Sequence, residues 1–380
     1  MIQEDLRGAA LDPIRSLECF DCLVPLPQPV RVGAATVTHR SYVVVRLTAE
    51  SGAWGTGVAF GRGLPVASII EESFAPLLIG ADSVAHQLVR ETLLAAYWPY
   101  AEGSLFSVAV SAVDLGLWDL SARRLGAPLA DLLGRHRRTV PMCAVASYAG
   151  EQSGDGLNAL KPEVAGYLEH GFRAVKLIVG ARSPEDDARR VAAVRELGGD
   201  ELSIVIDAFR SFTDVETALH RLRLLERFRV AYLEDPFSES LEALNADLRR
   251  RSGFSIGLGE SLGGSRAHRR LIEDGIVDVL RADASVVGGV REFLASAALA
   301  SAHGLSVSPH THPELHVHLA AAIPNLYGAG IEYMDPAVGL DAFHRLLATP
   351  LEIVDGEAIV PDRPGFGLDL DWDAIGAYRR

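Results

Sequence analysis

The stretch from residue 201 to residue 260 contains three short apolar runs that each end in acidic residues: ELSIVID (201–207), VAYLED (230–235) and FSIGLGE (254–260). Runs of this length and composition are typical of buried strands in a parallel sheet. Asp207, Glu234 and Glu260 would then stand at the carboxyl ends of three successive strands. Those ends face the site end of an α/β barrel or of an open α/β sheet.

Three carboxylates that converge in an apolar cavity repel one another and become protonated unless a cation lies between them. A divalent cation resolves this conflict, and ligation by oxygen alone favours Mg²⁺ over zinc or copper. The alternative is that each acid caps the helix after its strand. Because the three acids recur about every 27 residues at the same point of the pattern, we predict a shared Mg²⁺ site.

From about residue 140 the chain alternates between short apolar runs and amphipathic helical segments. The expected strands begin near Val140, Arg173, Ser203, Val230, Phe254, Val279, Leu305 and Tyr327. About eight β-then-α units predict an α/β fold with a (β/α)7-8 TIM-like barrel. An open doubly wound sheet remains the alternative, because the period alone does not prove closure.

The rest of the chain predicts a second, smaller domain. SYVVVRLTAESG (41–52) and the apolar run after it read as a hairpin, and helical patterns follow. We therefore expect an α+β capping domain over residues 1–135 and the barrel over residues 136–345. The Pro- and Gly-rich segment 346–380 is expected to return to the capping domain.

Further polar residues end the remaining strands and would point into the same barrel mouth. His310 is a candidate general base or acid, and Asp283 on the neighbouring strand would fix the tautomer of its ring and raise its pKa. Lys176 lies in an apolar run of a chain that has one other lysine, Lys161, so it needs a partner or a role. Glu332 could donate a hydrogen bond if burial keeps it protonated.

Composition excludes several classes of function. The 380 residues are 48% hydrophobic and 23% charged, with a net charge of −14, which argues against nucleic acid and anionic membranes as partners. The N-terminus MIQEDLRG does not resemble a signal peptide, so we expect a cytoplasmic protein. Cys19, Cys22 and Cys143 suggest no disulfide framework, and the single CxxC has no second pair to complete a zinc site.

The motifs resemble, in order and over nearly the whole chain, the mandelate racemase subgroup of the enolase superfamily. They are GLWDLSARRLGAPLADLLG, VIDA, EDP, GLGES, ADASVVGGV, PHTHPELHVHLAAAIP and IEYMDP. The resemblance implies that Asp207, Glu234 and Glu260 are Mg²⁺ ligands. It also implies that Asp283 and His310 form a His–Asp dyad and that Glu332 is an electrophilic acid near the substrate carboxylate. A Lys or His base with Mg²⁺ that stabilises an enediolate is the known pattern of this superfamily.

The resemblance also implies where specificity lies. Two loops of the capping domain, expected near residues 20–35 and 55–63, would close the barrel mouth and select the substrate. Arg31, His39 and Arg62 are candidates to bind a distal hydroxyl or carboxylate, with a solvated surface role as the alternative.

Three positions depart from the family pattern. Ile178 stands where a second lysine is common, so two-base racemisation is disfavoured, because isoleucine transfers no proton. Phe209 replaces a common asparagine near the metal, and Arg281 places a charge inside the barrel that needs an anion. A muconate-lactonising enzyme is disfavoured too, since it would carry a lysine where Asp283 stands.

The leading prediction is a Mg²⁺-dependent dehydratase of an acid sugar or related α-hydroxy carboxylate. His310 would abstract the α-proton, a metal-stabilised enediolate would lose the β-hydroxyl, and a 2-keto acid would result. The alternatives are a racemase or epimerase and a relic that binds metal or ligand without turnover. We expect a small-molecule carboxylate as substrate and a homo-oligomeric assembly.

Overall fold

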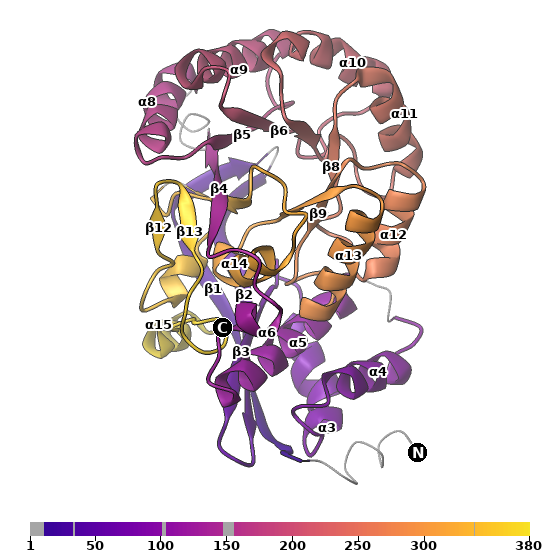
Figure 1. Ribbon diagram of the computed structural model, residues 1–380, viewed down its shortest axis with the longest axis vertical. Helices are drawn as coiled ribbons and strands as arrows, with labels where there is room; N and C mark the ends of the chain where they lie inside the picture. The colour runs from indigo at the N-terminus through magenta and orange to yellow at the C-terminus, as the bar shows by residue number, and fades with distance from the viewer. Residues whose placement is uncertain (1–10, 33–34, 101–103, 147–155, 338) are drawn as a thin grey trace.

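The fold is described from a computed structural model, which covers residues 11–32, 35–100, 104–146, 156–337 and 339–380. Two lobes are evident (Figure 1): a small antiparallel sheet with its helices, and a larger lobe in which helices surround parallel strands.

The smaller lobe is built on a three-stranded antiparallel sheet of β1 (Ile14–Val32), β2 (Ala35–Ala49) and β3 (Trp54–Phe60). Its helices are α2 (Val66–Ser68), the π-helix η1 (Ile69–Phe74), α3 (Ala75–Leu78), α4 (His86–Ala96) and α5 (Ser104–Arg124). The expected loop at 20–35 is instead largely a long β1–β2 hairpin, of which residues 33–34 lie outside the described chain. Likewise, most of 55–63 belongs to β3, and a turn follows.

Two glycines let β3 lie directly against α5. A Cβ atom at Gly57 would stand 1.9 Å from the carbonyl oxygen of Ala112, and one at Gly55 would stand 2.2 Å from the amide nitrogen of Leu120. Only a residue without a side chain permits so close an approach of two backbones. Leu105–Arg124 of α5 is long and apolar enough to cross a membrane by length and composition, but 83% of its most apolar window is buried inside the fold. Among the described helices, α5 is therefore best understood as a core helix.

The larger lobe is an α/β barrel whose strands run parallel. They are β4 (Thr139–Ala146), β5 (Ala174–Ile178), β6 (Ser203–Asp207), β7 (Tyr232–Glu234), β8 (Ile256–Leu258), β9 (Val279–Ala282), β10 (Ser306–Pro309) and β11 (Ile331–Tyr333). Adjacent strands pair in order from β4 to β10, and β11 pairs with β4. This last pairing joins the end of the strand series to its beginning, so the open-sheet alternative is wrong.

Helices cover the outside of the barrel (Figure 1). They are α8 (Gly156–Glu169), α9 (Pro184–Gly198), α10 (Val215–Arg223), the 3₁₀ helix η2 (Glu226–Phe228), α11 (Glu242–Ser252), α12 (Ser265–Glu273), α13 (Val290–Ala302) and α14 (Pro313–Ala322), while the short α6 (Leu129–Leu132) contacts α14. The predicted strand starts agree with the structure to within two residues, except that the last strand begins at Ile331 rather than near Tyr327.

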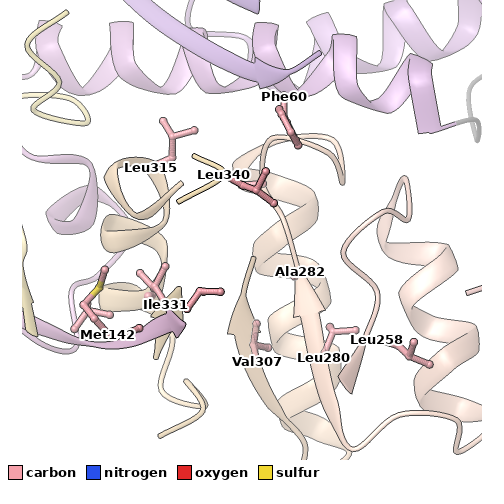
Figure 2. Close-up of a cluster of buried hydrophobic side chains, with 14 of the residues drawn as sticks. Phe60, Met142, Leu258, Leu280, Ala282, Val307, Leu315, Ile331 and Leu340 are labelled. Atoms are coloured by element: carbon pink, nitrogen blue, oxygen red, sulfur yellow. The ribbon is translucent and has the colours of Figure 1, made fainter. Parts of the chain in front are cut away.

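Apolar side chains from neighbouring strands fill the core, as Figure 2 shows for Leu258, Leu280 and Val307. The C-terminal segment contains the 3₁₀ helix η3 (Phe343–Leu346), β12 (Ile353–Val354), β13 (Glu357–Ile359) and α15 (Trp372–Tyr378). It contacts both lobes, because β13 pairs with β4 of the barrel while α15 packs on β1 of the small domain.

Candidate active site

The carboxyl ends of the barrel strands open into a cavity of about 370 Å³ that the small domain covers. From the barrel come Lys176, Asp207, Glu260, His310 and Glu332. The small domain contributes residues of β2 and of the end of β3. This volume is in the range of small-ligand sites.

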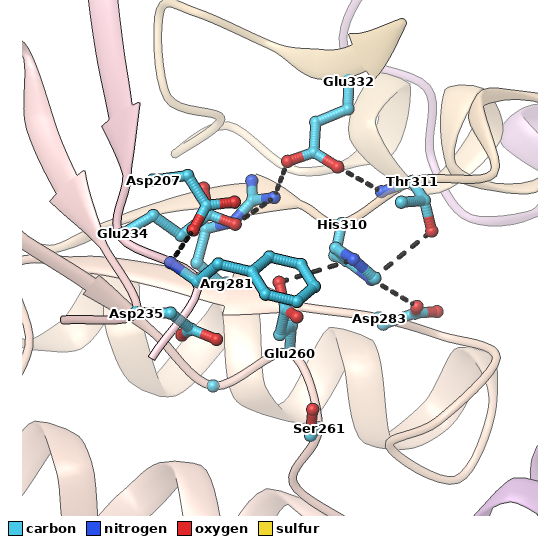
Figure 3. Close-up of polar contacts among 12 residues, drawn as sticks. Asp207, Glu234, Asp235, Glu260, Ser261, Arg281, Asp283, His310, Thr311 and Glu332 are labelled. Carbon is cyan, nitrogen blue, oxygen red and sulfur yellow. Dashed lines mark hydrogen bonds and ion pairs between the residues drawn. The ribbon is translucent and has the colours of Figure 1, made fainter. Parts of the chain in front are cut away.

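The predicted histidine and aspartate are in contact. His310 Nδ1 lies 2.9 Å from Asp283 Oδ2, and both side chains are buried (Figure 3). In the neutral ring this contact places the proton on Nδ1, so Nε2 carries the free lone pair. Burial lowers the pKa of His310, but Glu260 and the hydrogen bond to Asp283 raise it by more, and the net direction is upward.

Neighbouring polar groups hold this pair in place. The backbone N–H and the hydroxyl of Ser285 both donate to Asp283 Oδ1, at 2.8 and 2.7 Å. His316 donates from Nδ1 to the carbonyl of Thr311 at 2.8 Å and accepts from the N–H of Ala284. Sequence reasoning missed these supports, although the Asp-x-Ser spacing of a local turn was visible at Asp283 and Ser285.

Lys176 lies among carboxylates at the base of the cavity. Its Nζ is 3.2 Å from Asp207 Oδ2 and 3.1 Å from Glu234 Oε1, and it also pairs with Glu332. Burial lowers the pKa of Lys176, but these carboxylates raise it well above its usual value. These ion pairs favour the charged form of Lys176.

Arg281 is fully buried, as its strand position predicted, and it forms ion pairs with two carboxylates. Its guanidinium pairs with Glu332 and lies 3.2 Å from Glu234 Oε1. It also donates to the carbonyl and hydroxyl oxygens of Ser308, at 3.0 and 2.7 Å. A buried charge is tolerated when it is paired and hydrogen-bonded in this way.

These contacts correct the expectation that Glu332 is protonated. Burial raises the pKa of Glu332, but Arg281 and Lys176 lower it by more, so the group is a carboxylate. Its second oxygen accepts the N–H of Thr311 at 3.1 Å (Figure 3). Glu332 therefore accepts hydrogen bonds and pairs with both Lys176 and Arg281.

Glu260 lies beside the His310–Asp283 dyad. Its Oε2 is 3.4 Å from His310 Nε2, and its Oε1 is 3.4 Å from Arg210. Arg210 also pairs with Asp235 at 2.8 Å and donates to the hydroxyl of Ser261 at 2.9 Å. The sequence held a signal for Asp235, the second acid of the EDP motif, but none for Arg210.

The acids expected to bind Mg²⁺ were Asp207, Glu234 and Glu260. Within the described ranges, no three His, Cys, Asp or Glu side chains lie close enough together to hold an ion. Between Asp207 and Glu234 the ammonium group of Lys176 contacts both carboxylates. The donor chemistry nevertheless fits a hard cation. Glu234 Oε2 is buried without a hydrogen-bond partner, and burial raises the pKa of Asp207 and takes that of Glu234 to about 8. A cation bound at these oxygens would relieve that penalty.

The remaining predicted positions differ in their placement. Ile178 packs against the core and does not line the cavity, whereas Phe209 lines it and is 49% exposed. His39 and Arg62 line the cavity from the small domain. The side chain of Arg31 falls outside the described residues.

Comparison with known families matches nearly the whole chain. Residues 15–134 match the model of the mandelate racemase/muconate lactonizing enzyme N-terminal domain, and residues 159–374 match the enolase C-terminal domain-like model. The first match spans the small domain, and the second runs from within α8 through the rest of the barrel and into the C-terminal segment.

Individual relatives with known names share about a third of their residues with this chain over most of its length. A 3,6-anhydro-α-L-galactonate cycloisomerase of Streptomyces coelicolor is 31% identical over 93% of this chain and 96% of its own length. An L-talarate/galactarate dehydratase of Salmonella typhimurium is 31% identical over 89% of this chain and 82% of its own. The solved structure of L-talarate dehydratase from Polaromonas sp. JS666, complexed with Mg and L-glucarate, superposes with a TM-score of 0.87. It is 31% identical and covers 97% of this chain and 98% of that one.

Proposed function

Because the chain belongs to the mandelate racemase/muconate lactonizing enzyme family of the enolase superfamily, we propose that it is a Mg²⁺-dependent acid-sugar dehydratase. It removes water from an acid sugar or a related α-hydroxy carboxylate and yields a 2-keto acid. The observation that carries this proposal is the buried His310–Asp283 contact beside a group of carboxylates in one cavity. The dehydratases among the relatives, one of them solved with Mg and L-glucarate, support the substrate class.

In this proposal Asp207, Glu234 and Glu260 would hold the Mg²⁺ ion, and the buried oxygen of Glu234 that has no hydrogen-bond partner would be available as a ligand. The bound ion supplies positive charge at the substrate carboxylate, where negative charge develops as the α-proton leaves. Arg210 pairs with Glu260 and Asp235 and so helps to hold the ligand-bearing loops.

His310 carries both proton transfers. Its Nε2 takes the α-proton while Asp283 stabilises the resulting imidazolium through Nδ1. The same nitrogen then returns that proton to the β-hydroxyl as the Cβ–O bond breaks, so one water leaves in total. The enol that remains tautomerises to the 2-keto acid.

Lys176 supplies a permanent positive charge that draws the substrate carboxylate to the base of the cavity. Glu332 and Arg281 keep that cation in place, since Glu332 pairs with both. Lys176 and Glu332 line the cavity, whereas Arg281 is buried behind them and acts through its ion pair with Glu332. None of the three transfers a proton in this proposal.

A racemase or epimerase is the less favoured function. It needs a second proton carrier opposite His310, and the family position for that group is occupied by Ile178, whose side chain carries no proton to transfer and packs against the core. Lys176 is disfavoured in this role, because its ion pairs with Asp207, Glu234 and Glu332 favour its charged form.

The test is a screen of mono- and diacid sugars with Mg²⁺, in which 2-keto acids are detected with semicarbazide. We expect one acid sugar to give a keto product with the wild-type protein and none with His310→Asn. Exchange of the α-hydrogen with solvent deuterium without keto acid would favour the racemase or epimerase. Absence of both from every acid sugar, or equal rates in His310→Asn, would reject the proposed function and favour the relic.

A further inference from the structure

Three nitrogen-bearing side chains surround one aromatic ring on the small-domain side of the cavity. The guanidinium carbons of Arg40 and Arg62 lie 4.9 and 5.0 Å from the ring centroid of Phe60. The ring of His312 meets the same ring edge-on at 5.5 Å. All four side chains line the cavity that His310 shares.

The two guanidinium groups lack a matching number of anions. Within the part of the chain that the structure describes, neither Arg40 nor Arg62 forms an ion pair with a carboxylate. Arg40 donates from Nε to the carbonyl of Leu340 at 2.6 Å, which leaves its two terminal nitrogens for another acceptor. Acidic residues outnumber Lys and Arg in this chain by 50 to 36, so an arginine without an acidic partner is unexpected and suggests a role in binding.

Among the described residues that line the cavity beside Arg40 and Phe60, the carboxylate is Asp341, and part of its capacity to accept hydrogen bonds is already used. Its Oδ1 accepts the Tyr42 hydroxyl at 2.6 Å and the N–H of Phe343 at 2.9 Å. Two cations thus stand against one carboxylate, so the surroundings of Phe60 favour an anionic ligand.

His312 adds a second, independent sign of a ligand. It is 2% exposed, and neither ring nitrogen has a hydrogen-bond partner among the described residues. Thr311 and His312 both have left-handed backbones, with φ of 45° and 43°, which is unfavourable for residues other than glycine. Unpaired buried polar groups and strained backbone gather at binding sites.

Phe60 lies where the small domain meets the C-terminal part of the chain (Figure 2). It projects from the small domain toward Leu340 of the C-terminal part of the chain (Figure 2) and is followed by the turn Gly61–Gly63. Its ring meets the ring of His312 at an interplanar angle of 72°, so the imidazole and the two guanidinium groups all lie against the same ring.

We propose that Arg40, Arg62 and His312 form an anion subsite around Phe60 that binds a second carboxylate of the substrate, which makes the substrate a diacid sugar. This inference rests on the proposed function, which assigns the first carboxylate to the Lys176 side of the cavity. The planar fork of arginine matches a carboxylate, and it matches a terminal phosphate as well.

Binding can be measured without turnover in the His310→Asn protein with Mg²⁺. The probes are pairs of equal stereochemistry that differ at the last carbon: galactarate with galactonate, glucarate with gluconate, mannarate with mannonate and talarate with talonate. The corresponding aldonates phosphorylated at the last hydroxyl form a third set. We expect at least one diacid to bind about tenfold to a hundredfold more tightly than its monoacid, as charged hydrogen bonds provide.

Arg62→Gln and Arg40→Gln should each remove most of that preference, and Arg40→Lys should restore part of it. Arg15→Gln is the matched control, because Arg15 is exposed on the same sheet and does not line the cavity. Unfolding temperatures of the variants exclude loss of fold as the cause.

Equal binding of diacid and monoacid in every pair, no binding of any diacid, or a preference that survives Arg62→Gln would overturn the inference. A preference for the phosphorylated aldonates would overturn the diacid assignment. If wild-type protein forms no keto acid although the Arg62-dependent diacid preference is found, the dehydratase function fails and the subsite stands.

Discussion

Buried charge decides the character of individual residues in this site. Lys176 and Arg281 are both enclosed in the barrel, and both pair with Glu234 and Glu332. Each cation lowers the energy of the neighbouring carboxylates and each carboxylate keeps the cations charged, so the group is stable only as a set. This mutual dependence explains why Glu332 is an acceptor here rather than a protonated acid.

The dyad predicts a pH effect. Glu260 and Asp283 both raise the pKa of His310, and Asp283→Asn removes the charge of Asp283 and leaves a weaker amide acceptor. His310 must be neutral to accept a proton. Activity rises as pH increases through the pKa of His310, so in Asp283→Asn the midpoint of this acidic limb should move to lower pH. The maximal rate should also fall by about 10²–10⁴-fold, as expected for a disabled general base. Profiles of kcat/KM against pH check this, and an unchanged midpoint would contradict it.

The buried arginine predicts a stability effect. Arg281→Met leaves Glu332 and Glu234 with fewer partners in the interior and should lower the free energy of unfolding by about 3–5 kcal/mol. Arg250→Met is the control, because Arg250 is exposed and its ion pair with Asp247 should contribute at most about 1 kcal/mol. Urea unfolding of both variants measures the difference, and equal losses would show that the buried pairs add nothing.

At the scale of elements, close contacts fix how the two lobes meet. α5 packs on β3 through Gly55 and Gly57. Its opposite side meets the barrel, where Asp114 accepts the N–H of Val290 at 2.7 Å and Ser111 accepts that of Gly288 at 2.8 Å. Side chains of α5 thus satisfy backbone donors at the start of α13. One helix therefore joins the sheet that carries Phe60 to the barrel that carries His310.

Two glycine substitutions should change the stability of the fold in opposite directions. One lies at the contact between β3 and α5, and the other lies on an open face of α8. Gly57→Ala places a methyl group 1.9 Å from a backbone oxygen of α5 and should destabilise the fold by about 1–3 kcal/mol. Gly166→Ala lies inside α8 with no atom within 4 Å of the added carbon, and it should stabilise by about 0.5–1 kcal/mol. Thermal unfolding of the two variants distinguishes them, and a neutral Gly57→Ala would argue against the close packing.

At the scale of the whole molecule, the site exists only because both lobes are present. Barrel strands supply the dyad and the carboxylates, and the small domain supplies Phe60, Arg40 and Arg62. The C-terminal segment strengthens this arrangement, since β13 pairs with the barrel and the N–H of Arg380 donates to the carbonyl of Asp21 in β1. Under the proposed function, the barrel would carry the reaction and the small domain would help to select the substrate.

Metal binding should stabilise this assembly. An ion held by Asp207, Glu234 and Glu260 binds the folded protein, so Mg²⁺ at about 100 times its Kd should add about 2.7 kcal/mol. We expect the unfolding temperature to rise with Mg²⁺ and to return with a chelator. Glu234→Gln should abolish most of the rise, whereas Glu216→Gln, an exposed acid on α10, should keep it. An equal rise in both variants would reject the ligand assignment.

Short-range pattern was enough for the architecture and for part of the site. Apolar runs of strand length at regular spacing predicted the barrel strands. Because parallel strands bring their carboxyl ends to one side, the same pattern predicted that Asp207 and Glu260 would line one cavity. The contact of His310 with Asp283 followed from the same rule. The inward direction of Arg281 followed from the alternation of side chains along a strand.

The sequence pattern could not determine which charged side chains would form ion pairs with one another. The pairing of Arg281 with Glu332, the place of Lys176 between Asp207 and Glu234, and the part of Arg210 all depend on distances across the barrel. The gathering of Arg40, Arg62 and His312 at Phe60 likewise joins segments about 250 residues apart. A sequence specifies the direction of each side chain through local periodicity, but the energy of a charge depends on every neighbour within a few ångströms, and only the folded chain determines those neighbours.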